Sequence, residues 1–421
     1  MQEIIERACG LDVHQKTVVA CIMTGSEKKV KKEIKTFGTL TDDLRDLGQW
    51  IKENNVQDVA VESTGVYWIP VFNVLEGEFK LNIILANAKH IKNVPGRKTD
   101  VKDCEWICKL LKNGLIEASF IPPSDIRHIR NLVRYRDSLV NNLTAAKNRV
   151  IKNLEMGNIK LSSILSDVFG VSGWKVIRAI VDGQFDSVEL AKLIDKQVKA
   201  PRDIIKKALT GTLQMHHANI IKLMVRHIDE LESLIKSIEK EIKDNTQKYE
   251  IQMQQLQTIP GVGEKVAASI VAEIGINMNQ FHSPQHLASW AGLAPGNNES
   301  AGKKKSSAIR EGNAHLKKKL VEGAWSAVKS KKTYWYSAYQ RLKIRRGVKR
   351  ALVAIAHKIL ICAYWIVKKG ENYKELGVNY VDPNTQEKRA KYYAKQLEKI
   401  GIIGINDLIN KQLQEQLMQA V

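Results

Sequence analysis

Two acidic residues set in apolar runs constrain the fold of this chain more than any other feature. Asp12 lies between Leu11 and Val13 in a segment typical of a strand, and Glu62 ends the apolar run 59–61. An isolated buried carboxylate is costly unless a cation or hydrogen-bond donors offset its charge. Both acids therefore predict strand ends that gather negative charge at one place in a sheet.

Asp100 and Asp103 follow in the segment 98–103. If this segment is helical, the three-residue spacing puts both carboxylates on one face, about 5–6 Å apart at Cβ. For these two residues alone, acids complementing the first turn of a helix are the simpler interpretation. Together with Asp12 and Glu62, however, they form a set of oxygen ligands that suits Mg²⁺, with Mn²⁺ as a substitute. The sequence therefore predicts a metal site of the kind that phosphoryl transfer needs.

The charge of the chain indicates a polyanionic partner. The 421 residues carry a formal net charge of +21, with a pI near 9.6. Residues 301–350 contain 16 lysines and arginines against 2 acids, which leaves +14 in that stretch alone. Such concentration is typical of a surface that binds phosphates.

The cellular setting is predicted from what the sequence contains. Its five cysteines form no disulfide framework, which favours a reducing compartment. The N-terminus has no signal-peptide pattern, and the apolar run 351–367 is interrupted by His357 and Lys358. We expect a buried helix there, no membrane partner, and a cytoplasmic, nucleoid-associated protein.

The first part of the chain predicts a mixed α/β sheet. Its expected elements are strands at 7–24 and 30–37, a helix at 41–54 capped by Thr41, a strand through Val61, a helix from about Tyr67, a strand at 82–85 and a helix through Leu111. Pro122 and Pro123 end the pattern.

Long helices follow. The segments 126–154 and 217–256 have apolar residues at helical or near-heptad spacing, which predicts an antiparallel or intermolecular coiled coil, or else a packed bundle within one subunit. Three basic residues of the first segment, Arg127, Arg130 and Arg134, are candidates for nucleic-acid binding.

A third module begins at Pro260. Gly261 and Gly263 precede a predicted helix at 264–274, a pattern typical of a helix-hairpin-helix whose backbone N–H groups bind a phosphate. A glycine turn between helices is also common without any such role.

Ser300 lies in the turn-rich loop 292–302, just before a basic run. Its hydroxyl becomes a nucleophile only when a base or metal activates it and cations offset the phosphate charge. The candidate cations are Lys303, Lys304, Lys305 and Arg310. A surface loop whose serine caps a helix is the alternative interpretation.

These motifs occur in the order D…E…K-T-D-x-x-D, P-G-V-G, G-L-x-P-x-x-x-x-S-x-G-K and G-N-x-x-L. In combination, over roughly residues 8–370, the chain resembles the DEDD-type transposases of bacterial insertion sequences, the bridge-RNA-guided serine recombinases. The resemblance implies a ribonuclease H/RuvC-like N-terminal domain whose four acids bind Mg²⁺, and a C-terminal serine that bonds covalently to DNA. The acids fall on Asp12, Glu62, Asp100 and Asp103, and the serine falls on Ser300.

Two positions depart from the family pattern, namely Ala301, where many relatives have glycine, and Lys317, where arginine is common. Ser306 and Ser307 are therefore the other candidate nucleophiles. The expected domains are 1–124, RuvC-like; 125–254, helical coiled coil; 255–372, a mainly helical transposase domain with the serine; and 373–421, a helical tail.

The resemblance implies RNA-guided cleavage and rejoining of donor and target DNA through a phosphoserine, guided by a non-coding bridge RNA. A homo-oligomer, dimer to tetramer, is expected because strand exchange needs several cut strands. The alternatives are a metal-dependent junction nuclease that uses water, and a nucleic-acid-binding protein without catalysis.

Overall fold

The computed structural model describes residues 5–25, 29–63, 65–86, 91, 102–296, 298–300, 303–306, 308–309, 311–380 and 383–399. The chain divides into two compact units, Met1–Ile121 and Pro122–Val421. The domain boundaries expected from the sequence at 254/255 and 372/373 stay predictions.

The first unit contains a five-stranded mixed sheet in the order β3-β2-β1-β4-β5. Its strands are β1 Arg7–Val13, β2 Val18–Thr24, β3 Lys31–Phe37, β4 Asp58–Glu62 and β5 Asn82–Ala86. The first three strands pair antiparallel, whereas β4 is parallel to both β1 and β5. This order and mixture of directions is that of a ribonuclease H-type sheet, which confirms the predicted fold.

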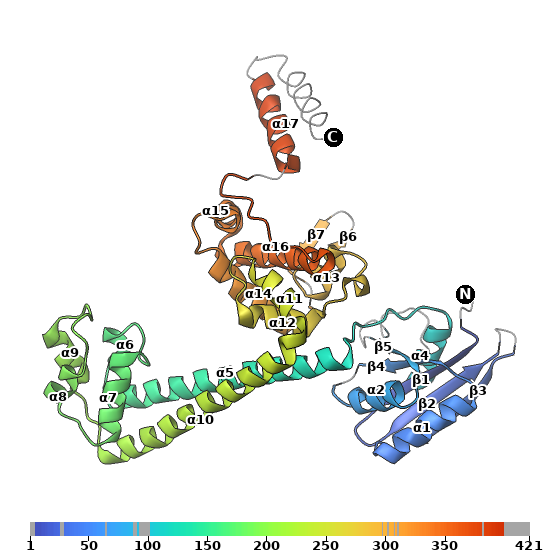
Figure 1. Cartoon of the computed structure of the whole chain (residues 1–421), viewed down its shortest axis with the longest axis horizontal. Coiled ribbons are helices and arrows are strands. Elements are labelled where there is room, and N and C mark those ends of the chain that lie inside the picture. Colours follow the sequence, from blue (N-terminus) through green and yellow to red (C-terminus); the bar gives the residue numbers. More distant parts are fainter. Residues whose placement is uncertain are drawn as a thin grey trace. The chain divides into compact units, whose positions relative to one another are not determined.

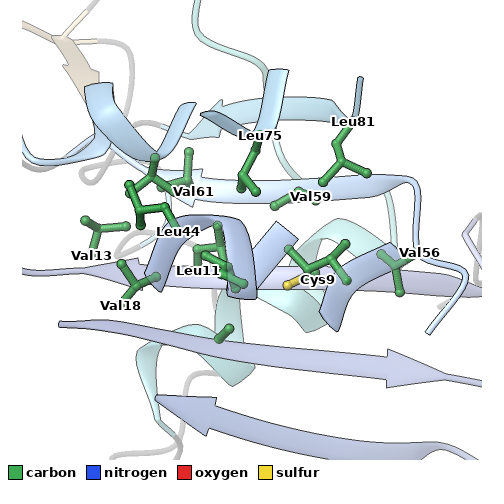
Figure 2. Packing of buried hydrophobic residues seen from close by; sticks show 14 of the residues in the cluster. Cys9, Leu11, Val13, Val18, Leu44, Val56, Val59, Val61, Leu75 and Leu81 are labelled. Carbon is green, nitrogen blue, oxygen red and sulfur yellow. The ribbon is translucent and has the colours of Figure 1, made fainter. Parts of the chain in front are cut away.

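Helices cover both faces of this sheet. Helices α1 (Thr41–Glu53) and α2 (Trp68–Gly77) pack on one face over a core that includes Cys9, Leu11 and Val61 (Figure 2). Helix α4 (Asp103–Lys112) packs on the other face, over alanines of β1 and β4. Side chains of a strand alternate between its faces. Odd-numbered residues of β1 and β4 therefore face α1 and α2, and even-numbered ones face α4.

Two details of the expected first unit are wrong. The predicted strand 7–24 is two strands, because the polar residues His14–Thr17 form a tight turn in which the His14 N–H donates to the Thr17 carbonyl oxygen (2.9 Å). Thr41 is the first residue of α1 instead of its cap. The residue before it, Leu40, donates its N–H to the Asp43 carboxylate (3.1 Å).

The second unit begins with two long helices, α5 (Ser124–Met156) and α10 (Met215–Thr246), which lie side by side (Figure 1). Arg136 pairs with Glu239 (2.7 Å) and Lys147 with Glu232 (2.9 Å), so the helices run antiparallel. The sequence left open whether these helices pair within one subunit or between subunits. In the described residues they form an antiparallel pair within one subunit. The connection between them holds α6 Leu161–Ile164, α7 Val171–Val181, α8 Ser187–Lys192 and α9 Arg202–Leu209.

The remainder of this unit is mainly helical, as predicted. Its elements are η1 Gln247–Tyr249, α11 Glu250–Gln257, α12 Glu264–Ile274, η2 Met278–Gln280, α13 Pro284–Trp290, β6 Asn298–Ser300, β7 Lys303–Ser306, α14 Ala314–Ala327, α15 Tyr334–Arg346, α16 Val348–Lys369 and α17 Pro383–Lys399. Helix α16 is long and apolar enough to cross a membrane, but half of its apolar stretch is buried. It packs against α11, α13, α14 and α15, as the core helix expected from the sequence does.

Candidate active site

Asp12 and Glu62 lie at the same edge of the sheet. In the parallel pair β1 and β4, Leu11 is opposite Val61, and the next residues along the two strands are Asp12 and Glu62. Because both positions are even-numbered, both acids belong to the face that α4 covers. Neighbouring parallel strands lie about 4.8 Å apart, so the two carboxylates stand side by side.

Helix α4 approaches this face closely at Gly10. A Cβ added to Gly10 would overlap the carbonyl oxygen of Cys104 and the amide nitrogen of Cys108. Any side chain at this position would push the helix away from β1. Gly10 therefore sets the distance at which α4 passes over the strand that carries Asp12.

The direction of α4 carries its N-terminus toward the two acids. Near the start of β1, the Ile5 N–H donates to the carbonyl oxygen of Lys112, the last residue of α4 (3.2 Å). Helix α4 thus runs opposite to β1, and its first residue, Asp103, comes toward the strand end that carries Asp12. Asp12 and Glu62 therefore share one edge of the sheet, and Asp103 begins the helix that runs toward this edge. The fourth, Asp100, lies outside the described residues.

The charge of Asp12 acts on a thiol in the first turn of α4. Hydrogen bonding to Cys21 and burial raise the pKa of the Cys104 thiol, and the negative charge of Asp12 adds to that rise. The Asp12 side chain is 22% exposed, and its carboxylate lies 3.2 Å from Nε2 of His14. His14 was missed in the sequence, although its position two residues after Asp12 was a signal.

The edge fits a hard divalent cation by its chemistry, since its donors are carboxylate oxygens and it opens toward solvent at Asp12. Within the described residues, no three His, Cys, Asp or Glu side chains already stand as a group able to hold a metal ion. Cys104 and Cys108 are buried, as small thiols of a core are, and contribute no such group.

Ser300 ends β6 and pairs with Lys303 of β7 in an antiparallel hairpin. The base of this hairpin is closed by the bridge between Pro295 and Ile309 and by the hydrogen bond from the Gly296 N–H to the Ala308 carbonyl oxygen (2.9 Å). The backbone places Ser300 at the turn end of the hairpin, next to the lysines of β7. Lys304, Lys305 and Ser306 also lie on β7, whereas Ser307 and Arg310 fall outside the described residues.

The chain that leaves this hairpin is anchored at Asn313. The Asn313 side chain accepts from the Leu316 N–H as the N-cap of α14 (3.0 Å) and donates to the Glu273 carboxylate (2.6 Å). Its backbone N–H donates to the Trp290 carbonyl oxygen (3.1 Å). The anchor therefore joins α12, α13 and α14 at the end of the segment that follows the hairpin.

Glu273 is a buried carboxylate, 1% exposed, that two arginines of α5 hold. Arg134 donates to both of its oxygens (2.7 and 2.8 Å), and the Arg130 guanidinium lies 3.4 Å away while donating to the backbone of α12. Burial by itself raises the pKa of Glu273, but Arg134, Arg130 and Asn313 together lower it below its usual value. This network ties the long helix α5 to α12 and to Asn313, the cap of α14.

We expect Glu273→Ala to lower the free energy of unfolding by about 3 kcal/mol, because it leaves the largely buried guanidinium of Arg130 and the partly exposed guanidinium of Arg134 without their counter-charge. The folded-state pKa of Glu273 is depressed, so its stabilisation is present above the unfolded pKa and is lost as pH falls through the folded value. Denaturant unfolding of Glu273→Gln should accordingly show a weaker acid destabilisation than wild type. The matched control is Glu189→Gln, which removes an exposed pair with Lys192 and should cost less than about 1 kcal/mol. Equal effects of the two changes would contradict the assigned network.

The other residues that were predicted to bind nucleic acid differ in the contacts that they make within the protein. Arg130 and Arg134 direct their donors to the protein, and burial lowers the pKa of Arg130 to about 10. Gly261 has φ +89°, and a Cβ there would overlap the backbone of α14, so packing already requires this glycine. Gly263 caps α12 with open space beside it. The binding roles of these residues and of Arg127 stay predictions.

Comparisons with known proteins find similarity both for the segment that contains the sheet and for the segment that contains Ser300. Residues 9–158 match the DEDD transposase family of the IS110 type, described as "Transposase", and residues 253–341 match the "Transposase IS116/IS110/IS902 family". The chain is 34% identical over 128 residues to the transposase for insertion sequence element IS1111A of Coxiella burnetii, which covers 29% of this chain and 34% of that protein. It is 30% identical over 125 residues to the pilin gene-inverting protein of Moraxella bovis, covering 28% and 37%. The chain thus spans about a third of the length of these relatives.

Proposed function

We propose that this chain cuts and rejoins DNA through a covalent phosphoserine, because residues 9–158 and 253–341 match two domain families of IS110-type transposases. The observation that supports the proposal is the placement of Asp12 and Glu62 on neighbouring strand ends of a ribonuclease H-type sheet, with Asp103 at the start of the helix that runs toward them. The net charge of +21 favours an anionic substrate, and acids in such a chain suit a bound cation that contacts this substrate.

The acids would hold Mg²⁺ or Mn²⁺ with Asp100 as the fourth ligand. The bound cation supplies positive charge that stabilises the phosphate in the transition state. Helix α4 would help to build the metal site. Gly10 allows the helix to pass close to β1 with Asp103 at its start, and the N-terminal N–H groups of α4 favour negative charge there.

In the proposed reaction the Ser300 hydroxyl loses its proton and attacks a DNA phosphorus. The phosphorus–oxygen bond to the neighbouring nucleotide breaks, and the departing oxygen takes up a proton. The phosphoserine keeps the bond energy until a DNA hydroxyl attacks it and restores Ser300. The hairpin and its Asn313 anchor would hold the serine on a rigid base, which efficient attack needs.

The proposed partners are donor and target DNA, a non-coding bridge RNA that selects them by base pairing, and further copies of this chain. Guidance and assembly rest on the resemblance of the chain to its family. A dimer or tetramer follows from the need to hold several cut strands together until they are exchanged.

The proposal is tested by incubating the full chain with its candidate RNA and end-labelled DNA that carries the ends of its element, with Mg²⁺ or with excess chelator. We expect a protein–DNA adduct that survives denaturing electrophoresis in Mg²⁺ and is absent in chelator. Full recombination in excess chelator would reject the metal site.

A metal-dependent nuclease is the second candidate, because the acids at this sheet edge also suit attack by water. It predicts free cut ends without protein attached. The same gel separates the two functions.

Salt dependence tests the basic hairpin. Changing Lys303, Lys304 and Lys305 together to glutamine should reduce the slope of log K against log salt for duplex DNA by about 2–3, since each phosphate contact contributes about 0.9. Changing Lys196, Lys199 and Lys206, which are exposed in another part of the unit, removes the same charge and should leave the slope unchanged. An unaltered slope in the hairpin variant would mean that these lysines do not meet phosphate.

A further inference from the structure

The corner between α15 and α16 is an uninterrupted exposed stretch. All eight residues from Lys343 to Arg350 are exposed, and Ile344 is 87% exposed. Gly347 alone links the two helices, with φ +76°. The stretch therefore forms a convex corner on the second unit.

Five of these eight residues are cations without a partner in the described part of the chain. The side chains of Lys343, Arg345, Arg346, Lys349 and Arg350 make no ion pair or hydrogen bond there. The sequence from 334 to 370 contains no acid, so neither helix supplies a counter-charge. Other basic residues differ in this respect, as Arg136 and Lys147 of α5 are paired with Glu239 and Glu232.

The arrangement is electrostatically unfavourable in the free protein. Five like charges repel one another within eight residues. Lys349 and Arg350 also stand in the first turn of α16, where the helix dipole favours acids and where no side chain caps the helix. Binding of phosphates relieves both effects at once.

We propose that the corner Lys343–Arg350 binds the phosphate backbone of duplex DNA. A convex surface suits an extended polyanion, whereas a small anion needs a concave site with converging donors. The exposed cations belong to the last turn of α15 and the first turn of α16, so long side chains from one short segment can reach several phosphates. Exposed Ile344 and Val348 lie among the cations and add apolar contact with sugars.

This surface lies apart in sequence from the Ser300 hairpin but on a connected frame. Helix α16 continues from the corner to His357, whose ring nitrogen contacts the Leu293 carbonyl oxygen at the base of the hairpin segment (3.3 Å). Nine residues of helix separate Val348 from His357, which is about 14 Å along the axis. The corner would therefore position DNA relative to the hairpin through one rigid helix. The choice of DNA as partner rests on the proposed function.

The test measures binding without cleavage. Arg345, Arg346, Lys349 and Arg350 are changed together to glutamine in the full chain, and the Kd for duplex DNA is followed by fluorescence anisotropy over a salt series in chelator. The matched control changes Lys196, Lys199, Lys206 and Lys207, which are exposed and without a partner in the described part, and removes the same charge. Thermal unfolding of both variants checks that the fold is intact.

We expect the corner variant to weaken binding at least about tenfold at 100 mM salt and to reduce the slope by about 2–4, while the control reduces it by less than about 1. A loss of DNA binding supports the proposal whether or not an RNA of equal length also binds less. A loss confined to RNA, or equal effects of both variants, would overturn it.

A second measurement does not depend on removing charge. Ile344→Cys places a thiol on the corner, and duplex DNA should slow its reaction with a thiol reagent at least about fivefold relative to the reaction without DNA. Unchanged reactivity under saturating DNA would reject the corner. Because neither measurement involves cleavage, each can fail or succeed independently of the Ser300 chemistry.

Discussion

Ser300→Ala is expected to abolish strand cleavage and the protein–DNA adduct while leaving nucleic-acid binding within about twofold of wild type. The change removes one hydroxyl at the end of β6 and no part of the hairpin backbone. Loss of a nucleophile typically lowers the rate by a factor on the order of 10⁴ or more. Denaturing electrophoresis with labelled DNA measures the adduct, and anisotropy measures binding. Ser300→Cys should retain weak activity, because a thiolate also attacks phosphorus.

Ser306→Ala is the control, since Ser306 lies on the partner strand of the same hairpin, where Asn298 is its partner. We expect it to leave cleavage unchanged. Peptide mapping of the wild-type adduct identifies the residue directly. An adduct on Ser306 or Ser307 would keep the mechanism and reject Ser300, and cleavage by Ser300→Ala at the wild-type rate would reject a serine nucleophile at this position.

Each of Asp12→Asn, Glu62→Gln, Asp100→Asn and Asp103→Asn is expected to lower recombination by a factor on the order of 10³ or more. These changes keep the size of the side chain and remove only the charge that a divalent cation needs. A loss of about 4 kcal/mol in transition-state stabilisation corresponds to this factor. Single-turnover recombination over a series of Mg²⁺ and Mn²⁺ concentrations measures it.

Asp58→Asn is the matched control for the acid variants, because Asp58 lies on the same face of β4 as Glu62 but at the opposite end of the strand. We expect it to retain activity. Without metal, the unfolding temperature of the variants at Asp12, Glu62, Asp100 and Asp103 should equal or exceed that of wild type, since a repulsion between like charges is removed. Inactive variants with lowered unfolding temperatures would instead assign these acids a structural role.

The acids at the sheet edge could be predicted because short apolar runs in a sequence indicate strands. Asp12 interrupts one run and Glu62 ends another, so both were expected at strand ends, and the parallel register of β1 and β4 brings them together. The turn at His14–Thr17 was not expected, because four polar residues between two apolar runs were read as part of one strand.

The place of Asp103 depends on packing that one sequence does not display. The pattern predicted a helix through Cys108 and Leu111, but the close approach of this helix to β1 depends on the absence of a side chain at Gly10. A glycine inside an apolar run shows no such role until the opposing helix is present.

The buried network at Glu273 was also not predictable. Arg130 and Arg134 were grouped with the cations that meet nucleic acid, since charge alone does not reveal its partner. Their counter-charge is separated from Arg134 by 139 residues and becomes a neighbour only when α12 packs on α5.

The stereochemical course at phosphorus tests the central claim most directly. A DNA substrate with a phosphorothioate of one handedness at the cleavage position is recombined, and the handedness of the new junction is determined. Each in-line displacement inverts the configuration at phosphorus. Two displacements through Ser300 predict a junction with the original configuration, whereas direct attack by a DNA hydroxyl in one step would give the inverted configuration and contradict the phosphoserine.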